Sequence, residues 1–164
     1  MVQKSLLRDA ILKQLREELA RQSSAAELSR DEAISEESRA ENKWDTHSQE
    51  AAYLAEGQAK LAQEVVNNID LYGAMTLPIF GPGEPAALGA IVQLGPVGGG
   101  ARGTGWYFIG PRAGGLELEI EGRTILVVTP QSPLGRQLLG KKVGEMVSVP
   151  GRGSLAKQLI VSVE

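Results

Sequence analysis

Apolar residues recur every three or four positions through the first part of the chain, from Lys4 to about Leu28. This spacing places them on one side of a helix, and most of the other positions hold Ala, Glu, Gln, Lys or Arg, which are good helix formers. A long amphipathic helix is therefore predicted. Its apolar side consists of Leu7, Ile11, Leu12, Leu15, Leu19 and Ala26.

A second stripe of the same period runs from about Trp44 to Tyr72. Its members are Ala51, Leu54, Gln58, Leu61, Val65, Asn68 and Tyr72. Two such stripes joined by a short connector are expected to pair as an antiparallel coiled coil. We interpret Gln58 and Asn68, which interrupt the apolar seam, as residues that set the register of the pair.

The hydrophobic pattern changes after residue 75. Residues 73–88 contain three prolines, and a helix does not easily continue through such a segment. We therefore predict a coiled-coil hairpin over residues 1–75, a linker over 76–87 and a second domain over 88–164.

Short apolar runs in the second domain are typical of strands, among them residues 89–94, 106–109 and the strictly alternating 116–121. Further runs at 123–129, 146–149 and 155–163 enclose one helix, which begins near Ser132. The predicted fold class is α+β: an N-terminal antiparallel helical coiled-coil hairpin, then a small β-rich domain of four or five strands with one short helix.

The residues around that short helix carry clear start and stop signals. The Ser132 hydroxyl can cap the helix, Pro133 suits its first position, and Gly140 can adopt the left-handed conformation that ends it. The helix is expected to lie across the sheet with one apolar side. That side is Leu134, Leu138 and Leu139, while Arg136, Gln137, Lys141 and Lys142 are expected in water.

Composition narrows the functional classes. The chain has no cysteine, which excludes disulfides and cysteine-bound zinc, and its single histidine, His47, cannot form a catalytic dyad with a second one. There is no basic stripe or aromatic platform for nucleic acid. No apolar run is long enough to cross a membrane, so a soluble cytoplasmic protein without an active site of its own is expected.

Charge is distributed unevenly. Residues 1–75 hold 14 acidic and 9 basic residues, a net charge of −5, whereas residues 76–164 have a net charge of +2. The connector between the two helical stripes, residues 29–45, contains six carboxylates, namely Asp31, Glu32, Glu36, Glu37, Glu41 and Asp45. Such a run is either a solvated helix end or a group of oxygen ligands that could share a magnesium ion.

The sequence from Ser132 resembles a known family. Four segments resemble the C-terminal domain of the bacterial transcript cleavage factors GreA and GreB. They are Ser132-Pro-Leu-Gly-Arg136, Leu138-Leu-Gly-Lys-Lys-Val-Gly144, a Val-Ser-Val-Pro strand and a final Leu-Ile-Val-Ser-Val strand. The resemblance is specific over about 30 residues. It implies an FKBP-like domain without isomerase activity, which docks on RNA polymerase at the mouth of the secondary channel, and a hairpin that reaches toward the active centre.

The resemblance also implies roles for particular residues. Polymerase docking is expected in the segment Ser132, Pro133, Leu134, Gly135, Arg136, Lys141 and Lys142. At the tip, the family's carboxylates help the polymerase to hold a second magnesium ion and hydrolyse its own backtracked transcript. Glu41, followed by Asn42, matches the family's glutamate, with Asp45, Glu36 or Glu37 as possible substitutes for the missing aspartate. The protein would have no cofactor of its own and would share Mg²⁺ with the polymerase.

The tip departs from the family pattern, because Ser38 occupies the place of the family's aspartate. Three interpretations follow: a cleavage-stimulating elongation factor, a secondary-channel regulator or inhibitor that does not stimulate cleavage and competes with the cleavage factors, and a coiled-coil adaptor unrelated to polymerase. The first two predict a monomer with RNA polymerase as partner and only indirect contact with the transcript. A prolyl isomerase is a weaker alternative by fold analogy.

Overall fold

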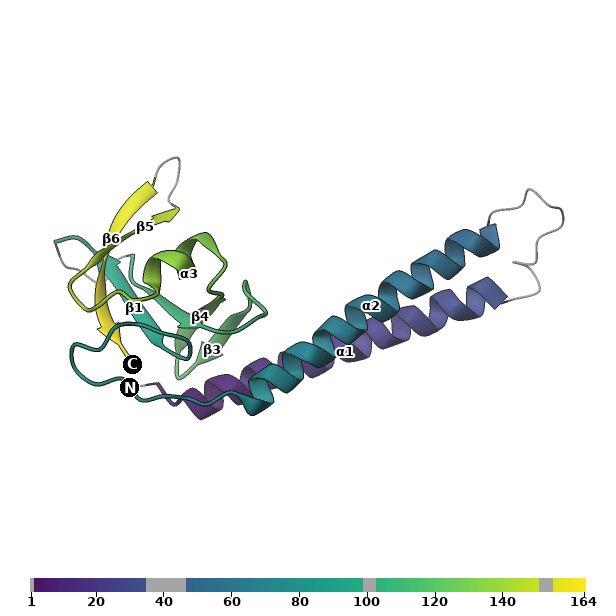
Figure 1. Ribbon diagram of the computed structural model, residues 1–164, viewed down its shortest axis with the longest axis horizontal. Helices are drawn as coiled ribbons and strands as arrows, with labels where there is room; N and C mark the ends of the chain where they lie inside the picture. The colour runs from purple at the N-terminus through teal and green to yellow at the C-terminus, as the bar shows by residue number, and fades with distance from the viewer. Residues whose placement is uncertain (1, 35–46, 99–102, 151–154) are drawn as a thin grey trace. The chain divides into compact units, whose positions relative to one another are not determined.

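The structure, a computed structural model, describes residues 2–34, 47–98, 103–150 and 155–164 (Figure 1). Two long helices precede a mixed sheet that carries one short helix, so the predicted α+β fold class is confirmed. Six strands occur in the described residues, one at each of the six runs named above, although the predicted total was four or five. The elements are α1 (Lys4–Ile34), α2 (His47–Ala74), β1 (Ile91–Pro96), β2 (Gly105–Ile109), β3 (Glu117–Ile120), β4 (Arg123–Val128), α3 (Pro133–Leu138), β5 (Met146–Pro150) and β6 (Leu155–Val163).

Residue contacts divide the chain into two compact units. Residues 12–70 form the helical unit, and residues 1–11 group with residues 71–164 in the unit that contains the sheet. The domain bounds predicted from the sequence (1–75, 76–87 and 88–164) remain a prediction, because a grouping of contacts does not identify the parts that fold independently.

In the helical unit, α1 and α2 lie side by side as an antiparallel pair (Figure 1). Leu15 and Ala26 of α1 and Val65 of α2 are buried. The predicted seam of α2 is wrong at two positions, because Leu54 and Leu61 are 53% and 46% exposed. Their neighbours Ala55 and Ala62 are partly buried instead. A helix of 3.6 residues per turn drifts from a strict seven-residue repeat, so a seam of that period does not stay on one face of a straight helix.

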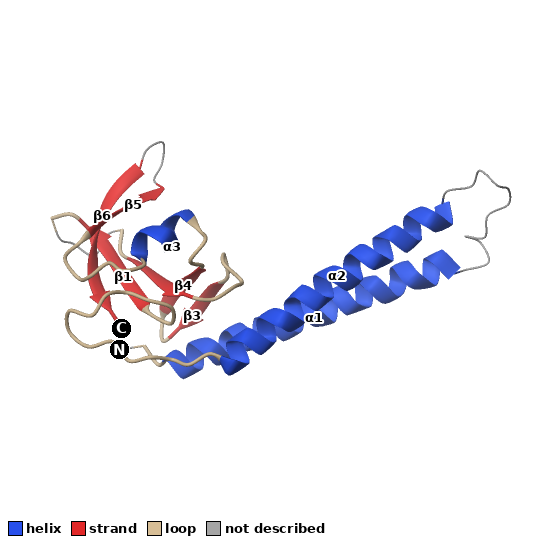
Figure 2. Cartoon of the chain, in the orientation of Figure 1, coloured by secondary structure: helices blue, strands red, loops and turns tan. Residues whose placement is uncertain are grey.

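The sheet has the strand order β3-β4-β2-β1-β6-β5 (Figure 2). Neighbouring strands are antiparallel except β2 and β4, which are parallel. The first two strands pair with each other, and Ile91 lies opposite Phe108. The β3–β4 hairpin turns at Glu121 and Gly122, whose φ angles are 50° and 72°. Two central residues with positive φ match the twist of the flanking strands and keep the hairpin tight.

Strand alternation gives the sheet two buried faces. One face packs around Leu138 of α3 and includes Val92, Leu94, Ile109, Val128, Val147 and Ile160. Other buried residues, among them Phe108 and Ile125, alternate with these along the strands and so belong to the opposite face. Tyr72, at the end of α2, is fully buried in the same compact unit, and its hydroxyl donates to the Arg112 carbonyl at 2.7 Å.

Candidate functional site

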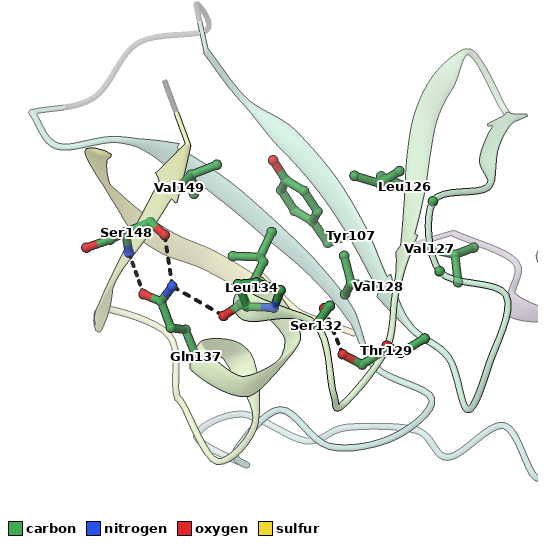
Figure 3. A pocket seen from close by; sticks show the side chains of 13 residues that line it. Tyr107, Leu126, Val127, Val128, Thr129, Ser132, Leu134, Gln137, Ser148 and Val149 are labelled. Carbon is green, nitrogen blue, oxygen red and sulfur yellow. Dashed lines mark hydrogen bonds between the residues drawn. The ribbon is translucent and has the colours of Figure 1, made fainter. Parts of the chain in front are cut away.

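An apolar groove of about 700 Å³ lies between α3 and the sheet (Figure 3). Its lining comes from β2, the β3–β4 segment, α3 and β5. The apolar part includes Tyr107, Leu126, Val128, Pro133, Leu134 and Val149, and the polar part includes Thr129, Ser132, Gln137 and Ser148. An apolar concavity with a few polar groups at its margin is suited to holding an apolar side chain or a small ligand.

The start of α3 is positioned by Ser132, as the sequence predicts. Ser132 has extended backbone (φ −68°, ψ 153°), and its hydroxyl oxygen accepts a hydrogen bond from the Gly135 N–H at 3.0 Å. The same hydroxyl donates to the Thr129 carbonyl at 2.8 Å (Figure 3). Pro133 occupies the first turn, where its missing N–H costs nothing. The cap therefore ties α3 to the end of β4.

Gly135 allows α3 to approach that strand end closely. A Cβ atom at this position would lie 1.9 Å from the Thr129 carbonyl oxygen and 2.7 Å from its carbon. Both atoms belong to the backbone and cannot move aside as a flexible side chain could. The glycine in the family-like motif is therefore required by packing, and it sets the depth at which Leu134 enters the groove.

Gln137 attaches α3 to the outer strand β5, although the sequence predicted this residue in water. Its side-chain oxygen accepts from the Ser148 N–H at 2.8 Å, and its amide nitrogen donates to the Ser148 carbonyl at 3.0 Å (Figure 3). A single amide thereby replaces a neighbouring strand at the open edge of β5. The prediction was wrong because helical periodicity cannot show which backbone lies beside a residue.

The predicted apolar side of α3 is correct for two leucines and wrong for the third. Leu138 is fully buried and Leu134 lines the groove, but Leu139 is 36% exposed. The helix ends at Leu138, and Leu139 is its C-cap with extended backbone (φ −57°, ψ 129°). Its side chain is therefore turned away from the helical face on which it was expected. Gly140 follows with the predicted left-handed φ of 78°.

The basic residues in and after α3 differ in the contacts that they make. Lys141 donates to the Glu145 carboxylate at 2.7 Å, and the other oxygen of that carboxylate accepts from the Lys142 N–H at 2.7 Å. These hydrogen bonds lower the pKa of Glu145 below its ordinary value. The side chains of Arg136 and Lys142 are exposed. The role of the segment Ser132–Lys142 in docking remains a prediction.

Sequence analysis missed the strand residues of the groove, chiefly Tyr107, Leu126 and Val149. Tyr107 lies partly buried on β2, and burial raises the pKa of its hydroxyl above the ordinary value. Because side chains alternate along a strand, Tyr107 and Phe108 of β2 lie on opposite faces of the sheet. This alternation could have placed Tyr107 on the sheet face that α3 covers. No periodicity in the sequence shows that β2 and β4 are neighbours in the sheet.

The predicted tip site lies outside the described residues, since Glu36, Glu37, Ser38, Glu41 and Asp45 all fall in residues 35–46. Across the part of the chain that is described, no group of three or more His, Cys, Asp or Glu residues is arranged to hold a metal ion. The same residues contain no helix long and apolar enough to cross a membrane.

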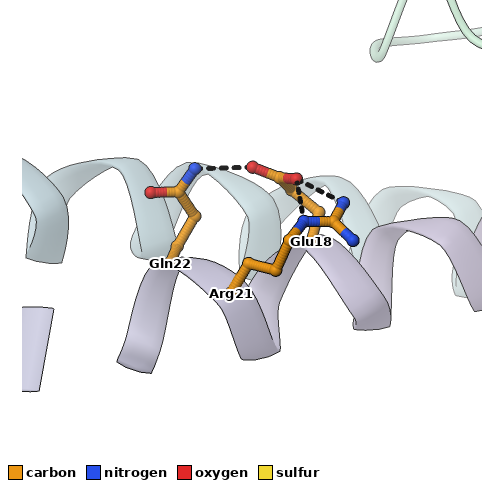
Figure 4. Close-up of polar contacts among 3 residues, drawn as sticks. All are labelled: Glu18, Arg21 and Gln22. Atoms are coloured by element: carbon orange, nitrogen blue, oxygen red, sulfur yellow. Dashed lines mark hydrogen bonds and ion pairs between the residues drawn. The ribbon is translucent and has the colours of Figure 1, made fainter. Parts of the chain in front are cut away.

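Polar contacts on the described part of α1 act within the helix. The Glu18 carboxylate accepts from Arg21 at 2.6 Å and from Gln22 at 2.5 Å (Figure 4). These hydrogen bonds lower the pKa of Glu18, with Gln22 as the main cause. Contacts three and four residues apart stabilise an exposed helix face, typically by a few tenths of a kcal/mol. We assign this cluster a structural role.

Comparison with known proteins gives similarity to solved structures alone. Neither a protein-family model nor a curated protein matches the sequence. The structure of GreA factor homolog 1 (Gfh1) from Thermus thermophilus aligns with a TM-score of 0.38 and 16% identity, covering 93% of this chain and 94% of that one. Thermus aquaticus Gfh1 aligns with a TM-score of 0.38 and 21% identity, covering 94% of this chain and 92% of that one.

Proposed function

We propose that the protein binds bacterial RNA polymerase through the secondary channel and regulates transcription elongation, with no active site of its own. One observation carries the proposal. Four residues of the segment that resembles the cleavage factors, Ser132, Pro133, Leu134 and Gln137, line one wall of an open apolar groove. A protein surface with one protruding apolar side chain could be held there, and the exposed Arg136 and Lys142 could contact acidic groups around it.

The length of the paired helices is consistent with entry into the secondary channel. α1 and α2 span 31 and 28 residues, and at 1.5 Å per residue each extends roughly 40 Å. A rod of this length can carry its connector into a narrow channel while the groove is held at the entrance. The connector would present Glu41 and Asp45 to the polymerase, with Glu36 and Glu37 close by in the sequence.

Binding is tested with purified core polymerase and the fluorescently labelled protein. Leu134→Glu places a charge in the groove, and Arg136→Glu reverses an exposed charge on the same helix. We expect each change to weaken binding about tenfold or more. The matched control is Val161→Glu, because Val161 is also partly exposed but alternates with Ile160 and faces away from the groove.

The outcomes separate the interpretations. Equal binding of all four proteins would exclude the groove as the docking surface. If the unaltered protein does not bind polymerase at all, the proposal is wrong, and the coiled-coil adaptor is favoured. Circular dichroism of Leu134→Glu would show whether the fold is retained, and Arg136→Glu tests the same surface from an exposed position.

We also propose that the protein stimulates transcript cleavage, which depends on the carboxylates of the connector between the two helices. Magnesium shared with the polymerase would be held by Glu41 and Asp45, whose carboxylate oxygens are suitable ligands for this ion. A stalled, backtracked complex supplied with magnesium and the protein would be followed by the length of its labelled transcript. Shortening that disappears in Glu41→Ala would assign cleavage stimulation to Glu41. Binding without shortening would favour the regulator that does not stimulate cleavage, as Ser38 suggests.

A further inference from the structure

A second cavity, of about 570 Å³, lies in the sheet-containing unit and is separate from the groove. It is formed where the residues before α1, the segment after α2 and Glu164 come together. Its apolar lining is provided by Val2, Leu77, Ile79 and Phe80. The volume is far larger than the roughly 30 Å³ that one water molecule occupies in the liquid. An apolar group of several carbon atoms therefore has room there.

The amine of Lys4 borders this cavity. Its Nζ donates to the Pro78 carbonyl at 2.5 Å and lies 4.6 Å from the centre of the Phe80 ring. Burial lowers the pKa of Lys4 to about 8, while the charge of Glu164 opposes the shift. A large fraction of this amine is then neutral near pH 8, whereas an ordinary lysine with a pKa of about 10.4 is almost entirely protonated.

The surroundings of Lys4 differ from those of other lysines in the described residues. Lys13, Lys60 and Lys141 each lie within 4.0 Å of a carboxylate, which favours the ammonium form. The hydrogen-bond partner of Lys4 is a carbonyl oxygen. The adjoining cavity combines the apolar residues named above with Gln3, Ser5 and Glu164, and only the charge of Glu164 favours the ammonium form there. A neutral amine keeps a lone pair after it donates to that carbonyl, so it can act as a nucleophile.

We propose that Lys4 is a site of acylation by activated acyl donors, acyl phosphates or acyl thioesters, and that the adjoining cavity holds the acyl chain. The neutral amine attacks the acyl carbon and forms the C–N bond of an amide. The bond from that carbon to the phosphate oxygen or thioester sulfur breaks, and its electron pair leaves with the phosphate or thiolate. The proton released from nitrogen passes to water, so no oxidant or reductant is needed.

Acylation would change the contacts among the three segments that form the cavity. A neutral amide has no attraction to the Glu164 carboxylate, and it loses the cation–π contact with Phe80. Glu164 also accepts a hydrogen bond from the Val2 N–H at 2.8 Å. The modification therefore acts at a point where residues from both ends of the described chain meet.

The test uses the full-length protein at pH 8 with acetyl phosphate in one arm and acetyl, butanoyl and hexanoyl thioesters of N-acetylcysteamine in the other. Peptide mass spectrometry follows the initial rate at each lysine. We expect Lys4 to react at least about fivefold faster than the exposed Lys142 and Lys157 in both arms. The ratio should also increase with acyl chain length, because a longer chain buries more apolar surface.

Two exposed apolar residues provide matched variants. Ile79→Ser removes part of the cavity wall, and Val97→Ser makes the same kind of change at a residue outside the cavity lining. The first should flatten the dependence on chain length and the second should leave it unchanged. A rate at Lys4 no higher than at Lys142 and Lys157 would overturn the proposal. A fast rate that is independent of chain length would overturn the role of the cavity.

Discussion

Gln137 and Ser148 are joined by two hydrogen bonds, through which one side-chain amide satisfies both backbone groups of a residue on β5. The bonds close the open edge of β5 and hold α3 at a set distance from it. Helix α3 has only six residues and cannot be stable by itself. Its position, and with it the shape of the groove, therefore depends on contacts of this kind.

Gln137→Ala is expected to lower the free energy of unfolding by about 1–2 kcal/mol, because it leaves the Ser148 N–H and carbonyl without their partner. Urea unfolding followed by circular dichroism measures the change. Gln22→Ala, which removes a glutamine hydrogen bond on the surface of α1, should change the free energy by less than about 0.5 kcal/mol. Equal effects of the two substitutions would contradict the role given to Gln137.

Two glycines should respond to alanine in opposite directions. Gly135→Ala places a Cβ against the backbone of Thr129 and should cost more than about 3 kcal/mol or prevent folding of the sheet-containing unit. At Gly57, in the middle of α2, nothing lies within 4 Å of an added Cβ. Gly57→Ala should stabilise α2 by about 0.5–1 kcal/mol. Thermal unfolding of both variants tests the pair, and a tolerated alanine at residue 135 would contradict the packing argument.

Tyr72→Phe removes the buried hydrogen bond to the Arg112 carbonyl and should cost about 1 kcal/mol at neutral pH. Burial also raises the pKa of Tyr72 above its ordinary value. The stability associated with the neutral hydroxyl is therefore fully present below about pH 10 and is lost as the pH rises further.

The difference in free energy of unfolding between the unaltered protein and Tyr72→Phe should consequently be constant from pH 7 to 9 and should shrink above about pH 10. Urea unfolding at a series of pH values measures it. Tyr107→Phe serves as the comparison, because burial alone raises the pKa of Tyr107. A difference that stays constant through alkaline pH would show that Tyr72 does not carry the effect.

The register of the helical pair predicts unequal responses at neighbouring positions of α2. Val65 is 9% exposed and lies in the seam, whereas Leu61 faces water. Val65→Gln should lower the free energy of unfolding by about 1–3 kcal/mol. Leu61→Gln should change it by less than about 0.5 kcal/mol. Urea unfolding of the two variants decides between this register and the seam predicted from the sequence, in which both residues are buried and Leu61→Gln should cost about as much as Val65→Gln.

Local features were predictable because their physical causes lie within a few residues. Ser132 finds its hydrogen-bond donor at Gly135, and Pro133 and Gly140 match the conformations that a helix needs at its two ends. The same holds for the long helices and for most strands, whose period follows from the geometry of the backbone. The α+β class followed from the order of these elements.

Other features depend on residues far apart in the chain. The parallel neighbours β2 and β4 bring Tyr107 and Leu126 together, and the docking of α3 on β5 turns Gln137 from a surface residue into a partner of Ser148. In α2, Leu61 is exposed while Ala62 is partly buried, because helix packing responds to the shape of the partner as well as to hydrophobicity. The sequence thus determined the elements and their caps, while the tertiary structure decided which faces meet and so created the groove and the cavity beside Lys4.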